Sequence, residues 1–349
     1  MDTTGKVKGI VIKEHGSLNQ LDYNTELERA PLLNEEISIK VSYCGINHLD
    51  VWLREGGNGE KLSLPRIPGA DVVGRIEEVG KGVTHLHVGD YVTVYPGKGC
   101  GLCESCSHGQ ETACRHFQIL GYHFDGGYSQ YVHVQAKRAV KVAKEDIRSW
   151  AGVPVSYVTA WNALVTKAQM KASDTVVIWG ASGGLGFAAL SIAKAFGASI
   201  IGIVSSQEKI DALRKLGFDD VTFILRDEQT ASNVRKATGK AGADVVLDHV
   251  GAKTFQISLK MLKRNGRLAF CGVTTGSMAE VDLRLIFGKQ IMITGSWMGD
   301  LQDFHELVRF LERTRAFPHI DQVFQLEDIQ SAQQRLLDGK HIGKILLEV

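Results

Sequence analysis

The chain has 349 residues, of which 44% are apolar and 23% are charged, and these proportions are ordinary for a globular protein. This length favours two domains, since one domain commonly spans about 100–200 residues. The formal net charge of +1 gives no electrostatic reason to expect a nucleic acid or a membrane as partner. No apolar run approaches the ~18 residues that cross a bilayer, and residues 1–6 lack a signal core, so we expect a cytoplasmic protein.

Residues 1–148 are predicted to form a domain rich in strands and loops. Alternating or β-branched segments predict the strands, and glycines separate them. The predicted strands are Val7–Ile12, Glu36–Tyr43, Val72–Val79, Tyr91–Val94 and Gly127–Val134. The tail, 300–349, is predicted to hold two helices and a final strand, and to return to this first domain.

Four of the six cysteines lie close together, at Cys100, Cys103, Cys106 and Cys114. In a cytoplasmic protein such a cluster indicates a metal site rather than disulfides. Four thiolates satisfy tetrahedral zinc and leave no position for water or substrate, so a site of this kind is structural. An iron–sulfur cluster is the chemical alternative. We therefore predict one structural zinc ion per chain, held in a lobe over residues 97–116.

From residue 149 to 299, short apolar strands alternate with helical patterns. The helices are predicted over 185–196, 207–216 and 253–262. The strands are predicted at Val176–Trp179, Ser199–Val204, Asp244–Asp248, Arg267–Phe270 and Ile291–Thr294. Unbroken apolar strands that alternate with helices indicate a doubly wound parallel sheet covered on both faces. The predicted fold class is therefore α/β.

A glycine-rich loop lies between the first of these strands and the helix that follows it. Its residues are Gly180, Ala181, Ser182, Gly183, Gly184, Leu185 and Gly186. Glycines let the backbone approach a pyrophosphate, and the N-terminus of the helix offers free N–H groups to that anion. We predict that residues 180–185 bind a dinucleotide in a Rossmann-type domain.

The second strand of this domain predicts which dinucleotide is bound. An enzyme that uses NAD usually has an acidic residue at the strand tip, where it binds the ribose 2′-hydroxyl. Here Ser205 and Ser206 stand at the tip and Lys209 follows. Hydroxyl groups and a cation suit the 2′-phosphate of NADPH, while Glu208 leaves NADH as an alternative. Alternatively, Ser206 caps the following helix and Lys209 is a surface residue, with no role in cofactor binding.

These motifs occur together with further segments that resemble the medium-chain dehydrogenase/reductase superfamily. The further segments are Gly45–Asp50, Ile67–Gly74, Val88–Val92, Ser156–Trp161 and Val245–Gly251. The resemblance covers nearly the whole chain. It implies a GroES-like catalytic domain over 1–148 and 300–349, a Rossmann domain over 149–299, and an active site in the cleft between them.

The same resemblance implies further cofactor residues and an assembly. It implies that Thr159, Val250, Gly272, Val273 and Ser296 flank the dinucleotide and that Lys344 reaches its pyrophosphate. It also implies a homodimer or a homotetramer, formed through the strand at 291–294.

The positions that hold the catalytic zinc in the family's alcohol dehydrogenases are changed in this chain. The first cysteine ligand matches Asn47, the histidine matches Ala70, and the third ligand falls at Val155 or Ser156. Asp71 alone cannot hold zinc, because a catalytic site generally needs three protein ligands. The chain thus resembles the quinone reductase and enoyl reductase branch, although that branch commonly lacks the four-cysteine lobe. Some enoyl thioester reductases have a tyrosine where Asn58 stands, which argues against a fatty enoyl thioester as substrate.

The sequence therefore predicts an oxidoreductase that acts on a small molecule. Hydride from NAD(P)H would go to a quinone or to an activated C=C bond, because hydrogen bonds can stabilise the resulting enolate or phenolate. The candidate catalytic residues are Asn47, His48, Asp50 and Arg54. Asn47 could donate to the substrate oxygen, and Arg54 could attract an acidic substrate.

Two other interpretations remain. The chain could be an alcohol dehydrogenase with a displaced zinc ion at Cys44, His48 and Asp71. It could also be a non-catalytic NADPH-binding protein, as zeta-crystallin relatives suggest.

Overall fold

The computed structural model describes residues 6–349, except for the side chain of Asn58, and the chain forms two compact units. The first unit comprises the chain up to Ser156 together with 300–305 and 320–349, and the second comprises 157–299 and 306–319. This mixed architecture confirms the predicted α/β fold class. Residues 1–5, on which the prediction of no signal segment partly depends, lie outside the described residues. Within 6–349, no helix has the length and apolar character needed to span a membrane.

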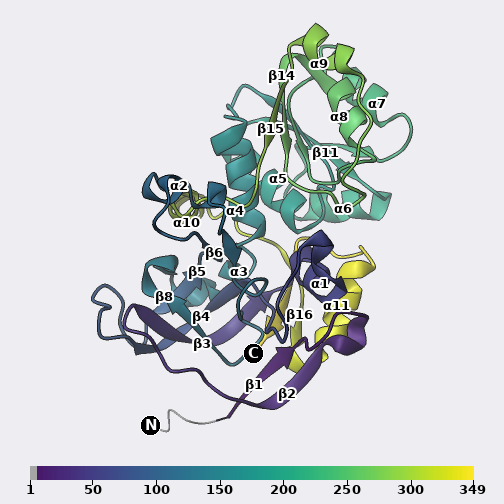
Figure 1. Ribbon diagram of the computed structural model, residues 1–349. Helices are drawn as coiled ribbons and strands as arrows, with labels where there is room; N and C mark the ends of the chain where they lie inside the picture. Colours follow the sequence, from purple (N-terminus) through teal and green to yellow (C-terminus); the bar gives the residue numbers. More distant parts are fainter. Residues whose placement is uncertain (1–5) are drawn as a thin grey trace. The chain divides into compact units, whose positions relative to one another are not determined.

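The main sheet of the first unit is built around β3 (Glu36–Gly45). Its strand order is β16-β17-β3-β4-β5-β9, with β8 also pairing with β3. In Figure 1 the yellow C-terminal strands lie beside the purple β3, and β17 pairs with β3, so the end of the chain packs in the sheet of the first unit. The other strands are β4 (Asp71–Val79), β5 (Tyr91–Val94), β8 (Tyr131–Gln135), β9 (Ala139–Lys141), β16 (Ile320–Gln325) and β17 (Lys344–Glu348).

Smaller elements complete the first unit. A hairpin pairs β1 (Val7–Val11) with β2 (Asp22–Leu27), and a second one pairs β6 (Gly97–Lys98) with β7 (Gln118–Ile119). The helices are α1 (His48–Glu55), α2 (Glu104–Ser107), α3 (Ile147–Trp150) and α11 (Ile329–Leu337). Helix α1 begins after β3 because Asn47 is extended there and the carboxylate of Asp50 accepts its backbone N–H at 2.8 Å.

The second unit contains a parallel sheet with the order β12-β11-β10-β13-β14-β15. Successive strands run outward from β10 in one direction and outward from β13 in the other. Right-handed crossovers therefore place the helices of the two halves on opposite faces. Dinucleotides bind outside the carboxyl ends of the strands at such a reversal point. The strands are β10 (Thr175–Ile178), β11 (Ser199–Val204), β12 (Thr222–Leu225), β13 (Ala243–Asp248), β14 (Leu262–Phe270) and β15 (Met292–Gly295).

The helices of the second unit follow the predicted alternation with strands. They are α4 (Ser156–Trp161), α5 (Gly184–Phe196), α6 (Gln207–Lys215), α7 (Thr230–Ala237), α8 (Phe255–Met261) and α9 (Leu283–Lys289). Val177, Trp179, Val246 and Leu268 belong to a buried cluster built on the sheet.

The unit boundaries differ from the predicted ones in two places. Residues 149–156 belong to the first unit, and 306–319 belong to the second. The second difference arises in α10 (Leu301–Thr314), where Phe310 lies 5.1 Å from the ring of Trp161 and 5.3 Å from that of Phe196. Aromatic packing thus draws the end of this helix into the second unit.

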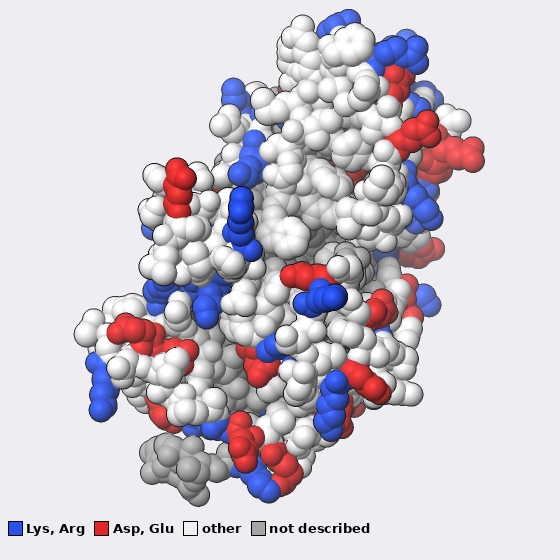
Figure 2. Space-filling model, in the orientation of Figure 1, with Lys and Arg blue, Asp and Glu red and all other residues white. Residues whose placement is uncertain are grey.

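Charged side chains of both signs are mixed on the face of the molecule that Figure 2 draws. This mixture agrees with the net charge of +1.

Candidate functional site

Three neighbouring strands of the first unit bring polar side chains together at one end of the sheet. The antiparallel register of β17 and β3 places Leu346 opposite Gly45, and the register of β3 and β4 places Gly45 opposite Asp71. Lys344 begins β17 and Asp71 begins β4. These two residues therefore lie on either side of the end of β3, where Asn47 follows.

The ammonium of Lys344 lies at the centre of a group that we call the lysine cluster: Asn47, Asp71, Ser156 and Lys344. Nζ donates to Asp71 Oδ2 at 2.8 Å and to Asn47 Oδ1 at 2.7 Å. It also donates to the backbone oxygen of Ile46 at 2.9 Å, and Ser156 Oγ lies 3.5 Å away. Lys344 is 2% exposed and Asp71 is fully buried, so water screens their attraction only weakly.

The amide of Asn47 has a fixed orientation in this cluster. A lysine can only donate, so the amide oxygen must face Lys344 and the amide nitrogen must face Asp71. Nδ2 donates to Asp71 Oδ2 at 2.9 Å. The other carboxylate oxygen, Oδ1, accepts from the backbone N–H of Val155 at 2.7 Å. A Cβ at Gly45 would lie 2.8 Å from Asp71 Oδ2, so glycine leaves the space that this carboxylate occupies.

Asp50 holds the backbone of Asn47 in place through a hydrogen bond. Its Oδ2 accepts both the backbone N–H of Asn47 and the hydroxyl of Tyr128, each at 2.8 Å. Its Oδ1 is buried and has no hydrogen-bond partner among the described residues. Burial accordingly raises the pKa of Asp50 to about 6. The structure thus shows Asp50 in a position to orient Asn47.

The other two predicted catalytic residues, His48 and Arg54, are not members of the lysine cluster. His48 is the exposed first residue of α1. Arg54 is 3% exposed, and its guanidinium donates to Gln333 Oε1 at 3.0 Å, to Glu55 Oε1 at 2.8 Å and to the backbone oxygen of Gly16. The prediction that Arg54 attracts a substrate is corrected, since this buried cation links α1 to α11 and to the N-terminal loop. A buried charge needs such partners, and only 3% of Arg54 is exposed for contact with a ligand.

The glycine-rich loop of the second unit joins β10 to α5, as the sequence predicts. Gly180 has a positive φ of 55°. A Cβ at Gly186 would collide with the backbone oxygen of Gly180, so the helix can approach the loop only with glycine there. At Gly183, the N-cap of α5, the nearest atom to an added Cβ is 3.6 Å away. Gly183, Gly184 and Leu185 are partly exposed, so an anion can approach the first N–H groups of α5.

The loop after β13 is fixed beside the glycine-rich loop. His249 Nε2 donates to the backbone oxygen of Trp179 at 2.8 Å, and burial lowers the pKa of this histidine. Asp248 Oδ1 accepts the backbone N–H groups of Val250 at 2.9 Å and Gly251 at 3.2 Å. These bonds join the carboxyl ends of β10 and β13, where the strand order reverses.

Other predicted cofactor residues lie in the same unit. Thr159 Oγ1 is 3.7 Å from Met298 Sδ. Asn162 Nδ2 donates to Ser296 Oγ at 3.0 Å and to the backbone oxygen of Met298 at 2.9 Å. The helical segment after Ser156 is thereby tied to the loop after β15. The remaining predicted residues follow β10 or β14 in the chain: Ala181, Ser182, Gly184, Leu185, Gly272 and Val273.

Basic residues gather near the tip of β11, where Ser205 and Ser206 stand and Lys209 occupies the first turn of α6. Arg226 was not among the predicted residues; it follows β12, and its backbone N–H donates to the backbone oxygen of Val204, the last residue of β11, at 2.8 Å. Burial, together with the positive charge of Arg226, lowers the pKa of Lys209. Glu208 accepts from the hydroxyl of Ser206, which lowers the pKa of Glu208.

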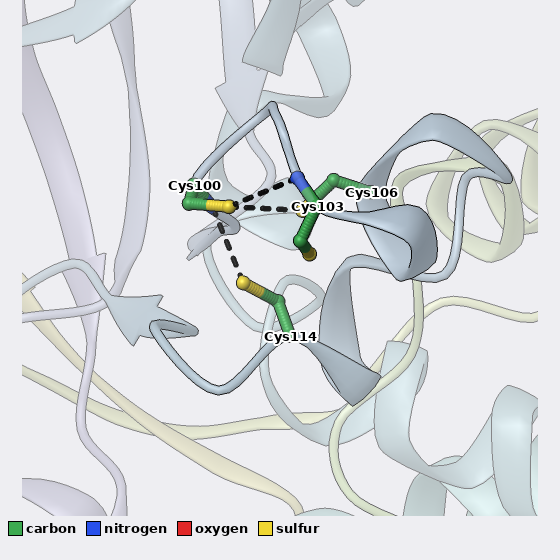
Figure 3. Close-up of side chains that lie close together, drawn as sticks. All are labelled: Cys100, Cys103, Cys106 and Cys114. Atoms are coloured by element: carbon green, nitrogen blue, oxygen red, sulfur yellow. Dashed lines mark hydrogen bonds between the residues drawn. The ribbon is translucent and has the colours of Figure 1, made fainter.

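Four cysteine sulfurs converge in the lobe of the first unit (Figure 3). The Sγ atoms of Cys100, Cys103, Cys106 and Cys114 all lie within 4.8 Å of one another. Tetrahedral zinc separates its sulfur ligands by ~3.8 Å. The Sγ atoms of Cys100 and Cys106 are 4.0 Å apart. Backbone N–H groups of Leu102 and Cys103 lower the pKa of Cys100 to about 6, whereas burial raises the pKa of Cys106 to about 12, so the four thiols would all ionise only when a cation binds. The group could hold zinc, whereas an iron–sulfur cluster would need wider spacing because its own atoms fill the centre.

The lobe is anchored to the rest of the first unit by a buried ion pair. Arg138 Nη1 donates to Glu111 Oε2 at 2.9 Å and also to the backbone oxygen of Gly97. A Cβ at Gly99 would lie 2.6 Å from Cys106 Sγ, so the convergence of the sulfurs requires glycine there.

Known dehydrogenases match the chain along its length. An "Alcohol dehydrogenase GroES-like domain" matches residues 34–144, and a "Zinc-binding dehydrogenase" family matches residues 184–313. An alcohol dehydrogenase of Geobacillus stearothermophilus is 33% identical over 327 residues, which cover 93% of this chain and 95% of that protein. The chain belongs to the zinc-type alcohol dehydrogenase-like family of medium-chain dehydrogenases/reductases.

Solved structures agree with this membership. A structure described as an NAD-dependent alcohol dehydrogenase has a TM-score of 0.93 and 32% identity, and the match covers 98% of this chain and 99% of that one. A crotonyl-CoA carboxylase/reductase has a TM-score of 0.88 and 26% identity, with 99% and 88% covered. The predicted superfamily is confirmed, and the protein is an oxidoreductase.

The catalytic zinc of the family's alcohol dehydrogenases does not fit the residues found here. Asn47 and Ser156 face the ammonium of Lys344, and Asp71 uses both carboxylate oxygens in hydrogen bonds. The displaced site would need Cys44, His48 and Asp71 to share an ion. Across the described part of the chain, the only group of three or more Cys, His, Asp or Glu placed to do so is the four-cysteine group.

Proposed function

We propose that the protein reduces a quinone, or a C=C bond conjugated to a carbonyl group, with hydride from NADPH. The lysine cluster is the observation that supports this most. Where alcohol dehydrogenases of the family have metal ligands, this chain has Asn47 and Ser156 beside an ammonium. A conjugated acceptor takes hydride at carbon while negative charge develops on its oxygen, and hydrogen-bond donors can stabilise that charge. A structural relative named a crotonyl-CoA carboxylase/reductase shares the fold and supports the same assignment.

The residues of the chain would hold the substrate oxygen. An amide nitrogen carries two hydrogens, and Asn47 Nδ2 gives one of them to Asp71. We assign the second hydrogen to the substrate oxygen. When bound, NADPH supplies the hydride, and one proton from solvent completes the addition of two hydrogens to the acceptor.

We propose NADPH over NADH because cations surround the tip of β11. Lys209 and Arg226 are close enough for each charge to affect the other, and the sequence offers Ser205 as a neighbouring hydroxyl. A 2′-phosphate would offset this repulsion and accept charge-assisted hydrogen bonds. Substitution of both cations (Lys209→Ala/Arg226→Ala) should raise the KM for NADPH and leave that for NADH nearly unchanged. Equal effects on both cofactors would argue against the 2′-phosphate site.

We also propose one structural zinc ion per chain and self-association through β15. The zinc ion would bind the four converging sulfurs. Strand β15 ends the sheet order of the second unit, and Met292 on it is 58% exposed while Phe287 on α9 is 73% exposed. An exposed strand edge with apolar neighbours is a common interface between subunits.

Oxidation of NADPH, followed at its absorbance maximum with a panel of quinones, enones and alcohols, tests the proposed reaction. We expect turnover of quinones or enones and negligible oxidation of simple alcohols with NADP⁺. Alcohol oxidation that a chelator abolishes would refute the proposal.

A further inference from the structure

We infer that the Lys344 ammonium is the resident cation of this site, fixed among Asn47, Asp71 and Ser156 in the place that a catalytic metal would otherwise take. The catalytic part of this inference, that the ammonium helps Asn47 to stabilise the substrate oxygen, rests on the proposed function. The structural part, that the ammonium occupies a cation site and keeps metals out, does not depend on the substrate.

The surroundings of Nζ form a coordination shell made of oxygen atoms. Ile46, Asn47 and Asp71 each contribute an oxygen within 2.9 Å, which matches the three N–H groups of an ammonium. Ser156 Oγ, at 3.5 Å, lies at the edge of the shell. The shell is assembled from segments that are 188 to 298 positions distant from Lys344 in the chain.

The charge balance of the cluster excludes a second cation. Lys344 and Asp71 form a buried pair of opposite charges 2.8 Å apart, with 2% of the Lys344 side chain and 0% of the Asp71 side chain exposed. A divalent ion among the same oxygens would meet the ammonium at close range with little water to screen the repulsion. It would also have to displace the hydrogen bonds that Nζ makes.

The burial of Lys344 also corrects its predicted role. The resemblance implied that this residue reaches the pyrophosphate of the dinucleotide. Its hydrogens are instead directed to oxygens of the first unit, and only 2% of the residue is exposed. An ammonium so placed cannot contact a phosphate without leaving Asp71 as an unpaired buried charge, which is costly.

The cation acts on the substrate through Asn47. The ammonium donates to the amide oxygen, which draws electron density from the amide nitrogen and makes Nδ2–H a stronger donor. Negative charge that develops on a substrate oxygen beside Nδ2 would therefore meet a polarised amide backed by a fixed positive charge. Lys344 is thus a positioning residue for Asn47 and the source of the positive potential at this site.

Measuring the zinc content of variants tests, without any substrate, whether the ammonium occupies a cation site and keeps metals out. Asn47→Cys/Ser156→Cys places two thiols beside Asp71, giving the three ligands that a catalytic zinc site generally needs. Adding Lys344→Met removes the ammonium, and methionine is one atom shorter, so the position of Nζ becomes vacant. We expect one zinc per chain, from the lobe, in the double variant and two in the triple variant. The inference is overturned if removal of the lysine leaves the metal content unchanged.

Kinetics test the catalytic part. Lys344→Met should lower kcat for the quinone or enone roughly 10- to 100-fold, as expected for loss of a charged hydrogen bond, with the KM for NADPH unchanged. Lys340→Met, at an exposed lysine nearby, is the matched control. Because an unpaired Asp71 would destabilise the fold, Lys344→Met/Asp71→Asn is measured in parallel. An unchanged kcat in folded variants, or a rise confined to the KM for NADPH, would overturn the assigned role.

The two experiments separate this inference from the proposed function. If the native protein reduces none of the quinones or enones, the reaction is wrongly assigned. The metal contents of the double and triple variants still decide whether Lys344 holds the cation position.

Discussion

Replacement of Asn47 by alanine perturbs the proposed donor to the substrate oxygen. The substitution removes the amide that lies 2.7 Å from Lys344 Nζ and 2.9 Å from Asp71 Oδ2. Loss of a single donor to a developing oxyanion typically lowers kcat by about 10²–10³-fold, equivalent to about 3–4 kcal/mol. We expect a fall of this size in kcat for the acceptor substrate, with little change in the KM for NADPH.

The fold should survive this substitution. Lys344 keeps Asp71 and the Ile46 oxygen as partners, so the free energy of unfolding should fall by about 1–3 kcal/mol out of a typical 5–15. Steady-state kinetics and thermal melting are measured together, with Asn34→Ala as a control at an exposed position. A folded variant that keeps the native kcat would refute the role assigned to Asn47.

Three other predictions follow from the geometry. Cys106→Ser should remove zinc from the lobe and lower the melting temperature, because a structural zinc site contributes to folding. Elemental analysis and thermal melting measure the two effects, and full retention of zinc would contradict the assigned ligands. Burial raises the pKa of Asp50 from 3.8 to about 6, so its ionisation should reduce the free energy of unfolding as pH rises from about 4 to about 6. Asp50→Asn should remove this pH dependence, which denaturant unfolding of both proteins across that range would measure. If the free energies of unfolding of the two proteins change with pH in parallel, the role given to Asp50 is wrong. Ile293→Lys on β15 should weaken self-association in light scattering, whereas an unchanged mass would move the interface elsewhere.

Much of the fold could be predicted because its signals are local. The apolar runs of β10, β11 and β13 and the glycines at 180–186 each lie within a few residues. The spacing of the four cysteines also brings their sulfurs together within one short segment. Such signals need no knowledge of which distant segments pair.

The lysine cluster could not be predicted, because its members meet through strand register. Asn47 and Lys344 are 297 positions apart, and only the pairing of β17 with β3 makes them neighbours. Arg54 was misjudged for a similar reason, since its partner Gln333 lies 279 positions away. Arg226 was missed because β12 is short and was not predicted, so its alignment with the tip of β11 was unknown.

The central claim is that this site reduces a conjugated acceptor with a fixed ammonium in place of a metal. It is tested most directly by measuring NADPH-dependent turnover of quinones and enones on protein whose zinc content has been determined. We expect turnover with one zinc per chain, at a rate that does not rise when zinc is added. Two zinc ions per chain, with alcohol oxidation that depends on the second, would contradict it.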